Sequence, residues 1–370
     1  MPPISVLIKP ASSLCNMRCK YCFYADITDN REVKSYGIMS EETLENLIKK
    51  AFDYASGSAT FAFQGGEPTL AGLDFYRKLL ELEEKYNVKK IPVQNAIQTN
   101  GYIIDEEWAK FLADNKFLVG LSMDGTKDIH DSLRLDAAGK GTFSRVQKTA
   151  RLFEKFGVEF NILCVVNNFI ARSPKKVYDS LKSYGFIQFI PCLDTFDGEK
   201  KVFSLTPERY TEFLKVTFNE YYKDFCAGHP ISVRNFDNYI GMLLGRPPEN
   251  CAMAGVCTCY TVVEGDGSVF PCDFYVLDEW KLGNINENSF AELITGEMAQ
   301  KFVGVSTYRN EECKECRWYP LCRGGCRRER EPIIDGTPSL NRFCECYKKF
   351  FEACYPKMEE IAVKVQRQYR

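Results

Sequence analysis

Short apolar runs alternate with amphipathic stretches through the first two thirds of the chain. The apolar run that begins at Ser5 predicts a first strand. Five further runs predict strands at 59–64, 93–98, 117–122, 159–166 and 186–192. Apolar positions at helical spacing predict helices at 40–55, 71–86, 105–115, 142–156, 173–185 and 206–226. Six strands that alternate with helices indicate an α/β fold with a parallel sheet, either barrel-like or doubly wound.

Residues at the ends of these segments support the same boundaries. Ser40 precedes two acidic residues and is expected to cap the first helix. Ser173 followed by Pro174 is typical of a helix start, and Gly157 and Gly185 stand where helices are expected to stop. The pattern therefore carries both start and stop signals.

Polar motifs follow four of the predicted strands. A group of cysteines follows the first strand, and the sequences QGGEP (64–68), QTNG (98–101) and SMDG (122–125) follow the next three. In parallel β/α folds the carboxyl ends of the strands meet at one edge of the sheet, where the reactive groups lie. We therefore expect these motifs to form a common site.

The alternation stops after about residue 235, and cysteines crowd the remainder of the chain. They are Cys251, Cys257, Cys259, Cys272, Cys313, Cys316, Cys322, Cys326, Cys344, Cys346 and Cys354. The sequence TVVEGDGSVFPCD (261–273) places two β-like runs around a Gly-Asp-Gly turn, which predicts a hairpin that carries Cys272. A last helix is expected from about residue 342. We therefore expect a β/α domain at 1–235 and a cysteine-rich domain at 236–370.

The cysteine count decides what the second domain can be. The chain has 17 cysteines and two histidines among 370 residues. Neither a basic leader nor a long apolar run marks a secretory signal or a membrane span, so we expect a cytoplasmic location, where disulfides are rare. Thiolate ligands favour zinc or iron–sulfur clusters over harder ions. The net charge of −2 provides no basic excess, so neither nucleic acid nor a membrane is an expected partner.

Three cysteines, Cys15, Cys19 and Cys22, lie within eight positions near the start of the chain. Three thiolates can hold three irons of a [4Fe–4S] cube and leave the fourth iron open to a small molecule. Two alternatives are a zinc site completed by a distant ligand and a loop with incidental thiols. The spacing favours the open cluster.

The opening motif resembles the signature of the radical S-adenosylmethionine (SAM) enzymes. CNMRCKYCFY (15–24) matches the CxxxCxxC pattern, with an aromatic residue before the last cysteine, and GGEP (65–68) matches the second motif of that superfamily. The resemblance implies a partial (β/α)6 barrel of the TIM type and a SAM molecule whose amino and carboxylate groups bind the fourth iron. It also implies reductive cleavage of SAM to methionine and a 5′-deoxyadenosyl radical.

The same resemblance implies a set of residues that bind SAM. They are Tyr21, Gly65, Gly66, Ser122, Arg134 and Leu193. Glycine lets the backbone approach the methionine moiety, Ser122 offers a hydroxyl, and Arg134 offers a fork for the carboxylate. Tyr21 and Leu193 are expected at the adenine. Each position also has a structural interpretation, as a turn, a cap, a surface charge or a core side chain.

The cysteine-rich domain resembles the SPASM extension of the superfamily, which carries two auxiliary [4Fe–4S] clusters. Matched position by position, the resemblance assigns one cluster to Cys251, Cys257, Cys272 and Cys326. It assigns the other cluster to Cys313, Cys316, Cys322 and Cys344. Spacing alone leaves a four-cysteine zinc site at 313–326 open. Together with the opening motif, the expectation is three [4Fe–4S] clusters and a redox function.

Runs beyond these motifs resemble the anaerobic sulfatase-maturating enzymes over nearly the whole chain. Examples are KPASSLCNMRCKYCFY, FAFQGGEPTLAGL, FLVGLSMDG, DGSVFPCDFYVLD and LCRGGCRR. The resemblance implies oxidation of a cysteine or serine, in a Cys/Ser-x-Pro-x-Arg context of an unfolded sulfatase polypeptide, to Cα-formylglycine. It implies Asp273 as the catalytic base. That position suits a base, because backbone geometry ties the carboxylate to the cluster ligand Cys272.

Partners are less well marked in the sequence. We expect a monomer that receives electrons from a small protein of the flavodoxin or ferredoxin type. Tyr24, Gln64 and Asn100 at strand ends are candidates for bonding the peptide backbone. Asp194 or Asp237 is a candidate for pairing with the arginine of the substrate motif.

Two other functions remain open on the sequence. One is a SPASM maturase that installs a thioether, an epimer or a crosslink in a ribosomal peptide, since one fold supports several reactions. The other is a zinc-organised binding module without redox activity. Iron analysis separates this module from the enzymes, because three cubane clusters require about twelve irons per chain.

Overall fold

A computed structural model describes residues 2–368, and the chain divides into two compact units. The first unit combines the segment that ends at Ser122 with Asp131–Phe160 and Cys259–Phe302. The second unit combines Met123–His130 and Asn161–Thr258 with the segment that starts at Val303. Each unit therefore joins segments that are far apart in the sequence.

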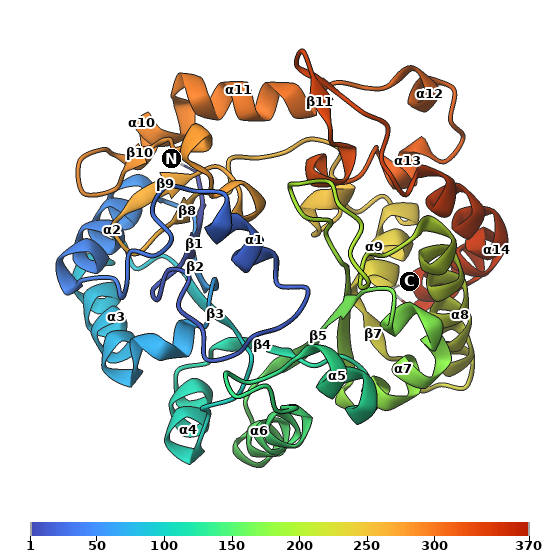
Figure 1. Ribbon diagram of the computed structural model, residues 1–370, viewed down its shortest axis with the longest axis horizontal. Helices are drawn as coiled ribbons and strands as arrows, with labels where there is room; N and C mark the ends of the chain where they lie inside the picture. The colour runs from blue at the N-terminus through green and yellow to red at the C-terminus, as the bar shows by residue number, and fades with distance from the viewer. Residues whose placement is uncertain (1, 369–370) are drawn as a thin grey trace. The chain divides into compact units, whose positions relative to one another are not determined.

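The first unit is built on a mixed sheet with strands in the order β10-β9-β8-β1-β2-β3-β4 (Figure 1). Its strands are β1 (Ile4–Ile8), β2 (Ala59–Phe63), β3 (Val93–Thr99), β4 (Leu118–Ser122), β8 (Val262–Val263), β9 (Ser268–Phe270) and β10 (Gly283–Asn284). Strands β1 to β4 pair in parallel, in the register that sets Ile4 opposite Ala59 and Ala96 opposite Leu118. β8 pairs in parallel with β1, whereas β9 runs antiparallel to both β8 and β10. The predicted hairpin therefore forms, and it extends the parallel sheet.

Helices flank the parallel strands of this unit. They are α1 (Phe23–Asp29), α2 (Glu41–Tyr54), α3 (Leu73–Tyr86), α4 (Glu106–Asp114), α6 (Phe143–Phe156) and α10 (Phe290–Thr295), with the short 3₁₀ helices η1 (Pro68–Ala71), η5 (Asp273–Tyr275) and η6 (Asp278–Trp280). Helices α2 and α3 lie on one side of the sheet and α1 on the other (Figure 1). Ser40 caps α2 by accepting a hydrogen bond from the Thr43 amide at 3.1 Å, as predicted. Gly157 ends α6 with a φ of +71°.

The second unit contains a further set of parallel strands and most of the long helices. Its strands are β5 (Phe160–Val166, from its second residue on), β6 (Phe186–Pro191), β7 (Ser232–Val233) and the small antiparallel pair β11 (Ile333–Ile334) and β12 (Thr337–Pro338). Its helices are α7 (Pro174–Leu181), α8 (Pro207–Cys226), α9 (Arg234–Leu243), α12 (Glu311–Lys314), α13 (Tyr319–Cys322) and α14 (Cys344–Gln368), with the 3₁₀ helices η2 (Ile170–Arg172), η3 (Lys182–Tyr184), η4 (Cys251–Met253) and η7 (Arg327–Arg330). Two more helices, α5 (Lys127–Leu133) and α11 (Glu297–Ser306), cross from one unit's segments to the other's. Helices α8 and α14 pack against each other (Figure 1).

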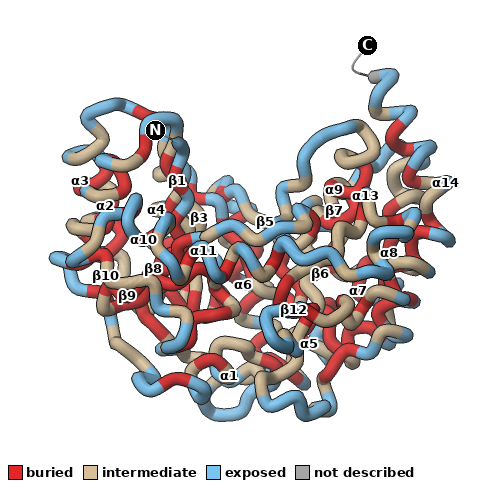
Figure 2. The backbone as a smooth tube through the Cα atoms, turned by 90° about the horizontal axis from the view of Figure 1, so that it is seen from above, coloured by how far each residue is buried: buried red, intermediate tan, exposed pale blue. Residues whose placement is uncertain are grey.

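Buried residues concentrate along the strands and on one face of the helices (Figure 2). In β2 the burial alternates, and Ala59, Phe61 and Phe63 are buried, as expected for a strand whose other face is less covered. Burying a phenylalanine of this kind stabilises the fold by about 2 kcal/mol. Within residues 2–368 the structure has no helix with the length and apolar character required to cross a membrane.

The predicted strands and helices are confirmed, with ends that differ by no more than two residues, except for the helix predicted at 173–185. There the α-helix α7 ends at Leu181 and the 3₁₀ helix η3 follows it. Gly185 ends η3 with a φ of +80°, so the stop predicted there is also confirmed. Ser173 is the N-cap residue of α7 and Pro174 follows it, as predicted, although the Ser173 side chain makes no capping hydrogen bond within the described part of the chain. Helices α1 and α5 were not predicted, because each is a short helix directly after a motif loop.

Candidate active site

The opening cysteines lie in the loop between β1 and α1. Cys15, Cys19 and Cys22 are half-buried, and Cys22 forms the N-cap of α1. The Met17 amide donates to the Cys15 sulfur at 3.4 Å. Burial raises the pKa of the Cys15 thiol to about 11. A thiol with this pKa is protonated near neutral pH. A bound metal would deprotonate it, because coordination to a metal ion removes the thiol proton.

A neighbouring segment holds the cysteine loop in place and brings two predicted SAM contacts together. The Arg18 amide donates to the Leu135 carbonyl at 2.7 Å. The adjacent Arg134 is buried, and its Nη1 donates to the Tyr21 hydroxyl at 2.8 Å. Tyr21 and Arg134, which lie 113 positions apart, therefore meet beside the cysteines.

The two glycines of the QGGEP motif allow its loop to lie against the cysteine loop. Gly65 and Gly66 have φ values of +93° and +54°. A Cβ atom on Gly66 would lie 2.3 Å from the Leu14 carbonyl oxygen, and one on Gly65 would lie 2.5 Å from Lys9 Cε. Glycine at 66 therefore lets the two motifs meet, and glycine at 65 leaves room for the Lys9 side chain.

Glu67 of the same motif is buried and fixes the end of β3. Its Oε1 accepts from the Thr99 hydroxyl at 2.8 Å, and its Oε2 accepts from the Asn100 amide at 2.7 Å. The Asn100 side chain donates to Asn16 Oδ1 at 2.8 Å and lies 3.8 Å from the Cys15 sulfur. The structure therefore shows Asn100 bonded to the cysteine loop.

Asp273 is a buried carboxylate at the start of η5, directly after Cys272. Its Oδ2 accepts from the Tyr24 hydroxyl at 2.7 Å and from Gln64 Nε2 at 2.8 Å, and the same Gln64 nitrogen donates to the Tyr24 oxygen at 2.6 Å. Its Oδ1 is buried and has no hydrogen-bond partner among residues 2–368. Burial raises the pKa of Asp273 to about 6, although the Lys9 ammonium lowers it. One carboxylate oxygen is thus held and the other is available.

A buried ion cluster adjoins Tyr24. Lys9 Nζ and Arg31 Nη1 each lie 2.6 Å from Glu264 Oε1. Burial opposes the ionised form of Glu264, but the two cations lower its pKa to about 2. Two positive charges on one carboxylate leave a net positive charge, and Lys9 Nζ lies 5.3 Å from the centre of the Tyr24 ring. Within this cluster Lys9 favours the ionised form of Asp273, and Glu264 opposes it by a smaller amount.

The remaining predicted SAM contacts lie at strand ends. Ser122 is the last residue of β4 and is half-buried. Gln64 and Asn100 follow β2 and β3, so the motifs share the carboxyl edge of these parallel strands, as predicted. Leu193 follows β6 in the second unit and is also half-buried.

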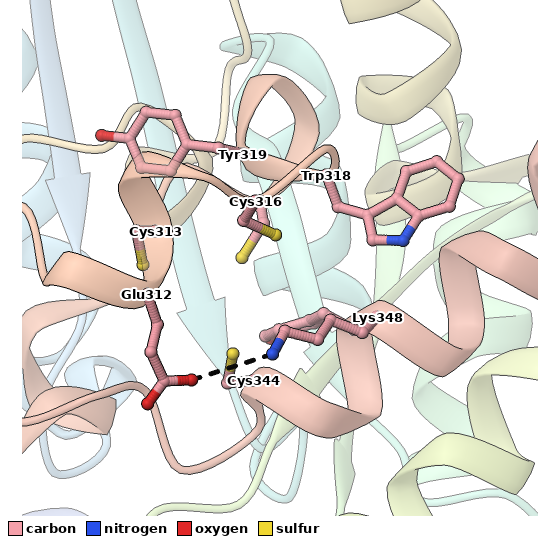
Figure 3. A pocket seen from close by; sticks show the side chains of 9 residues that line it. Glu312, Cys313, Cys316, Trp318, Tyr319, Cys344 and Lys348 are labelled. Carbon is pink, nitrogen blue, oxygen red and sulfur yellow. Dashed lines mark ion pairs between the residues drawn. The ribbon is translucent and has the colours of Figure 1, made fainter.

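Four cysteines of the second unit line one pocket (Figure 3). They are Cys313, Cys316, Cys322 and Cys344. The aromatic side chains of Trp318, Tyr319 and Tyr347 line the same pocket, and Lys348 lies at it, 3.9 Å from Glu312. Four thiols in an aromatic pocket are a donor set that fits an iron–sulfur cluster.

The other predicted set is divided between the two units. Cys251, Cys257 and Cys326 belong to the second unit, and Cys272 belongs to the first. Within the second unit, the Cys257 amide donates to the Ser306 hydroxyl at 2.8 Å. The assignment of these four cysteines to one cluster stays a prediction.

Sequence reasoning missed the partners of Asp273. Tyr24 and Gln64 were candidates for bonding the peptide backbone, and the structure shows both bonded to the Asp273 carboxylate. Their positions directly beside the two radical SAM motifs were the available signal. Only the fold brings them to Asp273, which lies 249 positions from Tyr24.

The two carboxylates considered for the substrate arginine already have partners. Asp194 forms ion pairs with Lys200, at 2.5 Å, and with Arg342. Asp237 accepts a hydrogen bond from the Tyr221 hydroxyl at 2.8 Å. Both groups are therefore engaged within the chain.

Comparisons with known families match two regions of the chain. Residues 10–181 match the radical SAM superfamily, and residues 251–317 match an iron-sulfur cluster-binding domain, the SPASM domain. The two matched regions contain the two groups of predicted ligand cysteines, except for those after residue 317.

Curated relatives match the chain over nearly its whole length. It is 52% identical to a cysteine-type anaerobic sulfatase-maturating enzyme of Clostridium perfringens, over 98% of this chain and 99% of the relative. It is 32% identical to a serine-type anaerobic sulfatase-maturating enzyme of Bacteroides thetaiotaomicron, over 99% of this chain and 93% of the relative. A solved structure described as native anSMEcpe with bound AdoMet and Cp18Cys peptide is 50% identical, with a TM-score of 0.94 over 98% of this chain and 100% of that chain.

Proposed function

Because the chain belongs to the anaerobic sulfatase-maturating enzymes, a family of radical SAM oxidoreductases, we propose that it oxidises a cysteine of an unfolded sulfatase polypeptide to Cα-formylglycine. The cysteine lies in a Cys-x-Pro-x-Arg context. The identity of 52% to a cysteine-type relative, against 32% to a serine-type one, supports cysteine as the substrate residue. Neither a ribosomal-peptide maturase nor a zinc-organised module is favoured by similarity of this extent.

The observation that carries the proposal is the arrangement around Asp273. Tyr24 and Gln64 hold Oδ2, while Oδ1 is buried without a partner among the described residues. We assign Asp273 as the catalytic base, which takes the proton of the substrate thiol at Oδ1. Its pKa of about 6 lets it be ionised at neutral pH and still accept a proton.

The residues at the strand ends fit the cofactor. We assign Cys15, Cys19 and Cys22 as ligands of the cluster that binds SAM, and Tyr21, Gly65, Gly66, Ser122, Arg134 and Leu193 as the residues that bind SAM. The fit is supported by the half-buried thiols of one loop and by the Tyr21–Arg134 bond beside them. When bound, SAM and the clusters supply a 5′-deoxyadenosyl radical, which removes a hydrogen atom from the substrate Cβ, and a sink for the remaining electron.

The oxidation removes one proton, one hydrogen atom and one electron from the substrate cysteine. The thiol loses its proton to Asp273, the Cβ atom loses a hydrogen atom, and one further electron leaves. The product is a thioaldehyde, in which a carbon–sulfur double bond has formed. Water then attacks this carbon, releases hydrogen sulfide and leaves the aldehyde of formylglycine.

The auxiliary ligands complete the cofactor set. We assign one auxiliary [4Fe–4S] cluster to Cys251, Cys257, Cys272 and Cys326, and a second to Cys313, Cys316, Cys322 and Cys344, which gives three clusters in all. The pocket that the second set lines supports this assignment. We place the radical SAM domain at 1–235 and the SPASM domain at 236–370, which is compatible with the matched regions.

The chemistry of the clusters supports a cellular location and an electron donor for the enzyme. We infer a cytoplasmic enzyme, because thiolate ligands stay reduced in that compartment. We infer a small electron-donor protein of the flavodoxin or ferredoxin type, because iron–sulfur clusters accept single electrons at low potential. We expect the enzyme to act as a monomer.

Two peptides that differ only in cysteine or serine at the first position of the motif test the substrate. Reduced enzyme and SAM are incubated with each peptide without oxygen, and the aldehyde is trapped with a hydrazide and identified by mass spectrometry. We expect formylglycine from the cysteine peptide, formed at least about tenfold faster than from the serine peptide. A cysteine peptide of unchanged mass, with 5′-deoxyadenosine still formed, would contradict the proposal.

A further inference from the structure

Three buried arginines follow the predicted ligand Cys326 in the second unit. Arg327, Arg328 and Arg330 expose at most 8% of their surface. A buried guanidinium is unfavourable unless an anion compensates its charge. Arg328 has such an anion, because its Nη1 lies 2.6 Å from Glu331 Oε2.

Arg330 differs from Arg328 because it contacts only backbone oxygens. Its Nη1 donates to the Ser306 carbonyl at 3.2 Å, and its Nη2 donates to the Tyr308 carbonyl at 2.5 Å. In the part of the chain that the structure describes, Arg330 forms no ion pair with an acidic side chain. Two carbonyl dipoles orient the guanidinium, but they do not neutralise a full charge. An anion of another kind is therefore needed nearby.

One contact of Arg330 connects it to Cys257, a member of the first predicted auxiliary set. Ser306, whose carbonyl binds Arg330, also accepts a hydrogen bond from the Cys257 amide at 2.8 Å. A Cβ atom on Gly324, in the loop between Cys322 and Cys326, would lie 3.9 Å from Arg330 Nη1. Gly324 lies two residues from Cys322 and two residues from Cys326, which belong to different predicted sets.

The contacts of the Arg330 guanidinium also lead to Cys313, a member of the second predicted auxiliary set. Tyr308, which binds Nη2 of Arg330, is followed by Arg309, and the Arg309 side chain donates to the Cys313 carbonyl at 2.8 Å. The contacts of Arg330 therefore lead to segments that hold cysteines of both predicted auxiliary sets.

We propose that Arg330 is a shared counter-charge of the two auxiliary clusters and raises both of their reduction potentials. The proposal rests on the ligand sets assigned above. Four thiolates around a [4Fe–4S] core carry a net negative charge that increases on reduction, so a fixed positive charge favours the reduced state. Arg330 does not touch the substrate; it is a positioning residue that acts through the clusters.

Redox titration of the auxiliary clusters tests this role. The full chain carries Cys15→Ala, Cys19→Ala and Cys22→Ala, so that only the auxiliary clusters give electron paramagnetic resonance signals. In Arg330→Gln we expect both midpoint potentials to fall by an amount equal to about a tenfold change in the reduction equilibrium, or about 59 mV. Arg330→Lys keeps the charge and should leave both potentials near those of the parent.

A matched control removes a buried guanidinium together with its anion. The double variant Arg328→Gln, Glu331→Gln deletes the neutral pair in the same segment and should shift both potentials much less than Arg330→Gln does. An equal shift in this control would show that any change near the segment moves the potentials, which would overturn the proposal. So would an equal fall in Arg330→Lys.

The iron content of the protein distinguishes a failure of the ligand assignment from a failure of the role of Arg330. If the parent holds fewer than about eight irons, the ligand assignment itself fails. If it holds about eight irons and Arg330→Gln leaves the potentials unchanged, only the role of Arg330 fails. If Arg330→Gln does not assemble the clusters, Arg330→Lys must restore both of them, and failure of the lysine variant to do so contradicts the role of charge.

Discussion

Asp273 has two carboxylate oxygens in different surroundings. Oδ2 accepts hydrogen bonds from Tyr24 and Gln64, and Oδ1 is buried without a partner among residues 2–368. The carboxylate is thereby oriented before substrate arrives. The nearby Lys9 favours its ionised form against the effect of burial. The held oxygen and the available oxygen support the assignment of Asp273 as the base.

Removal of the Tyr24 hydroxyl should slow the oxidation without slowing radical formation. Tyr24→Phe loses a hydrogen bond to an ionised group, which costs about 2 kcal/mol, or about thirtyfold in rate. We expect this loss in formylglycine formation, while 5′-deoxyadenosine forms as in the parent. Tyr86→Phe is the control, because it removes a hydroxyl that binds Glu45 instead. An equal fall in both products would contradict the assigned role.

Glu83 makes stability depend on pH. Its Oε2 accepts from Asn95 at 3.1 Å, its Oε1 has no partner within the described residues, and burial raises its pKa from 4.5 to about 7. Between these values the unfolded chain releases the proton and the folded chain keeps it, so the free energy of unfolding falls as pH rises, by about 3 kcal/mol in total. Glu83→Gln should therefore stabilise the protein at pH 8.

Urea unfolding at two pH values checks this expectation. The increase in the free energy of unfolding caused by Glu83→Gln should be largest at pH 8. It should be small at pH 5, where the wild-type carboxyl is protonated in the folded state. Glu84→Gln is the matched control, because Glu84 is exposed on the same helix. A gain from Glu83→Gln that is equal at both pH values would show that burial does not raise this pKa.

The elements of the fold could be predicted because their signals are local. A short apolar run marks β2, and Ser40 marks the start of α2. The hairpin β8–β9 also has a local signal in its Gly-Asp-Gly turn. Its parallel pairing with β1, which sets Leu7 opposite Val262, could not be predicted, because nothing near either residue specifies a partner so distant in sequence. The partners of Asp273 were missed for the same reason.

The contact between the two opening motifs can be tested through Gly66. In Gly66→Ala the new Cβ atom would lie 2.3 Å from the Leu14 carbonyl oxygen, at a φ of +54°, so the loops must separate. We expect a loss of about 2 kcal/mol in stability and weaker SAM binding by calorimetry. Gly157→Ala has a similar φ of +71° but no atom within 4 Å, so it should cost about 1 kcal/mol and leave SAM binding unchanged. Unchanged SAM affinity in Gly66→Ala would contradict the role of this contact.

At the scale of the whole molecule, the assigned roles rest on its thiols. Spacing alone indicated an open cluster at Cys15, Cys19 and Cys22, but the division of the later cysteines into two sets came from family resemblance. The structure brings the set that contains Cys313 into one pocket. The assigned roles join a radical-forming site, a base and two auxiliary clusters in one enzyme. Its central claim is that radical formation and substrate oxidation use different residues, and that Asp273 belongs to the second step.

The ratio of formylglycine to 5′-deoxyadenosine in Asp273→Asn tests that claim most directly. Asparagine keeps the shape of the side chain but cannot take the substrate proton. With the cysteine peptide, we predict that this variant forms 5′-deoxyadenosine and that its formylglycine yield per 5′-deoxyadenosine falls at least about a hundredfold. A ratio equal to that of the wild-type enzyme would contradict the account.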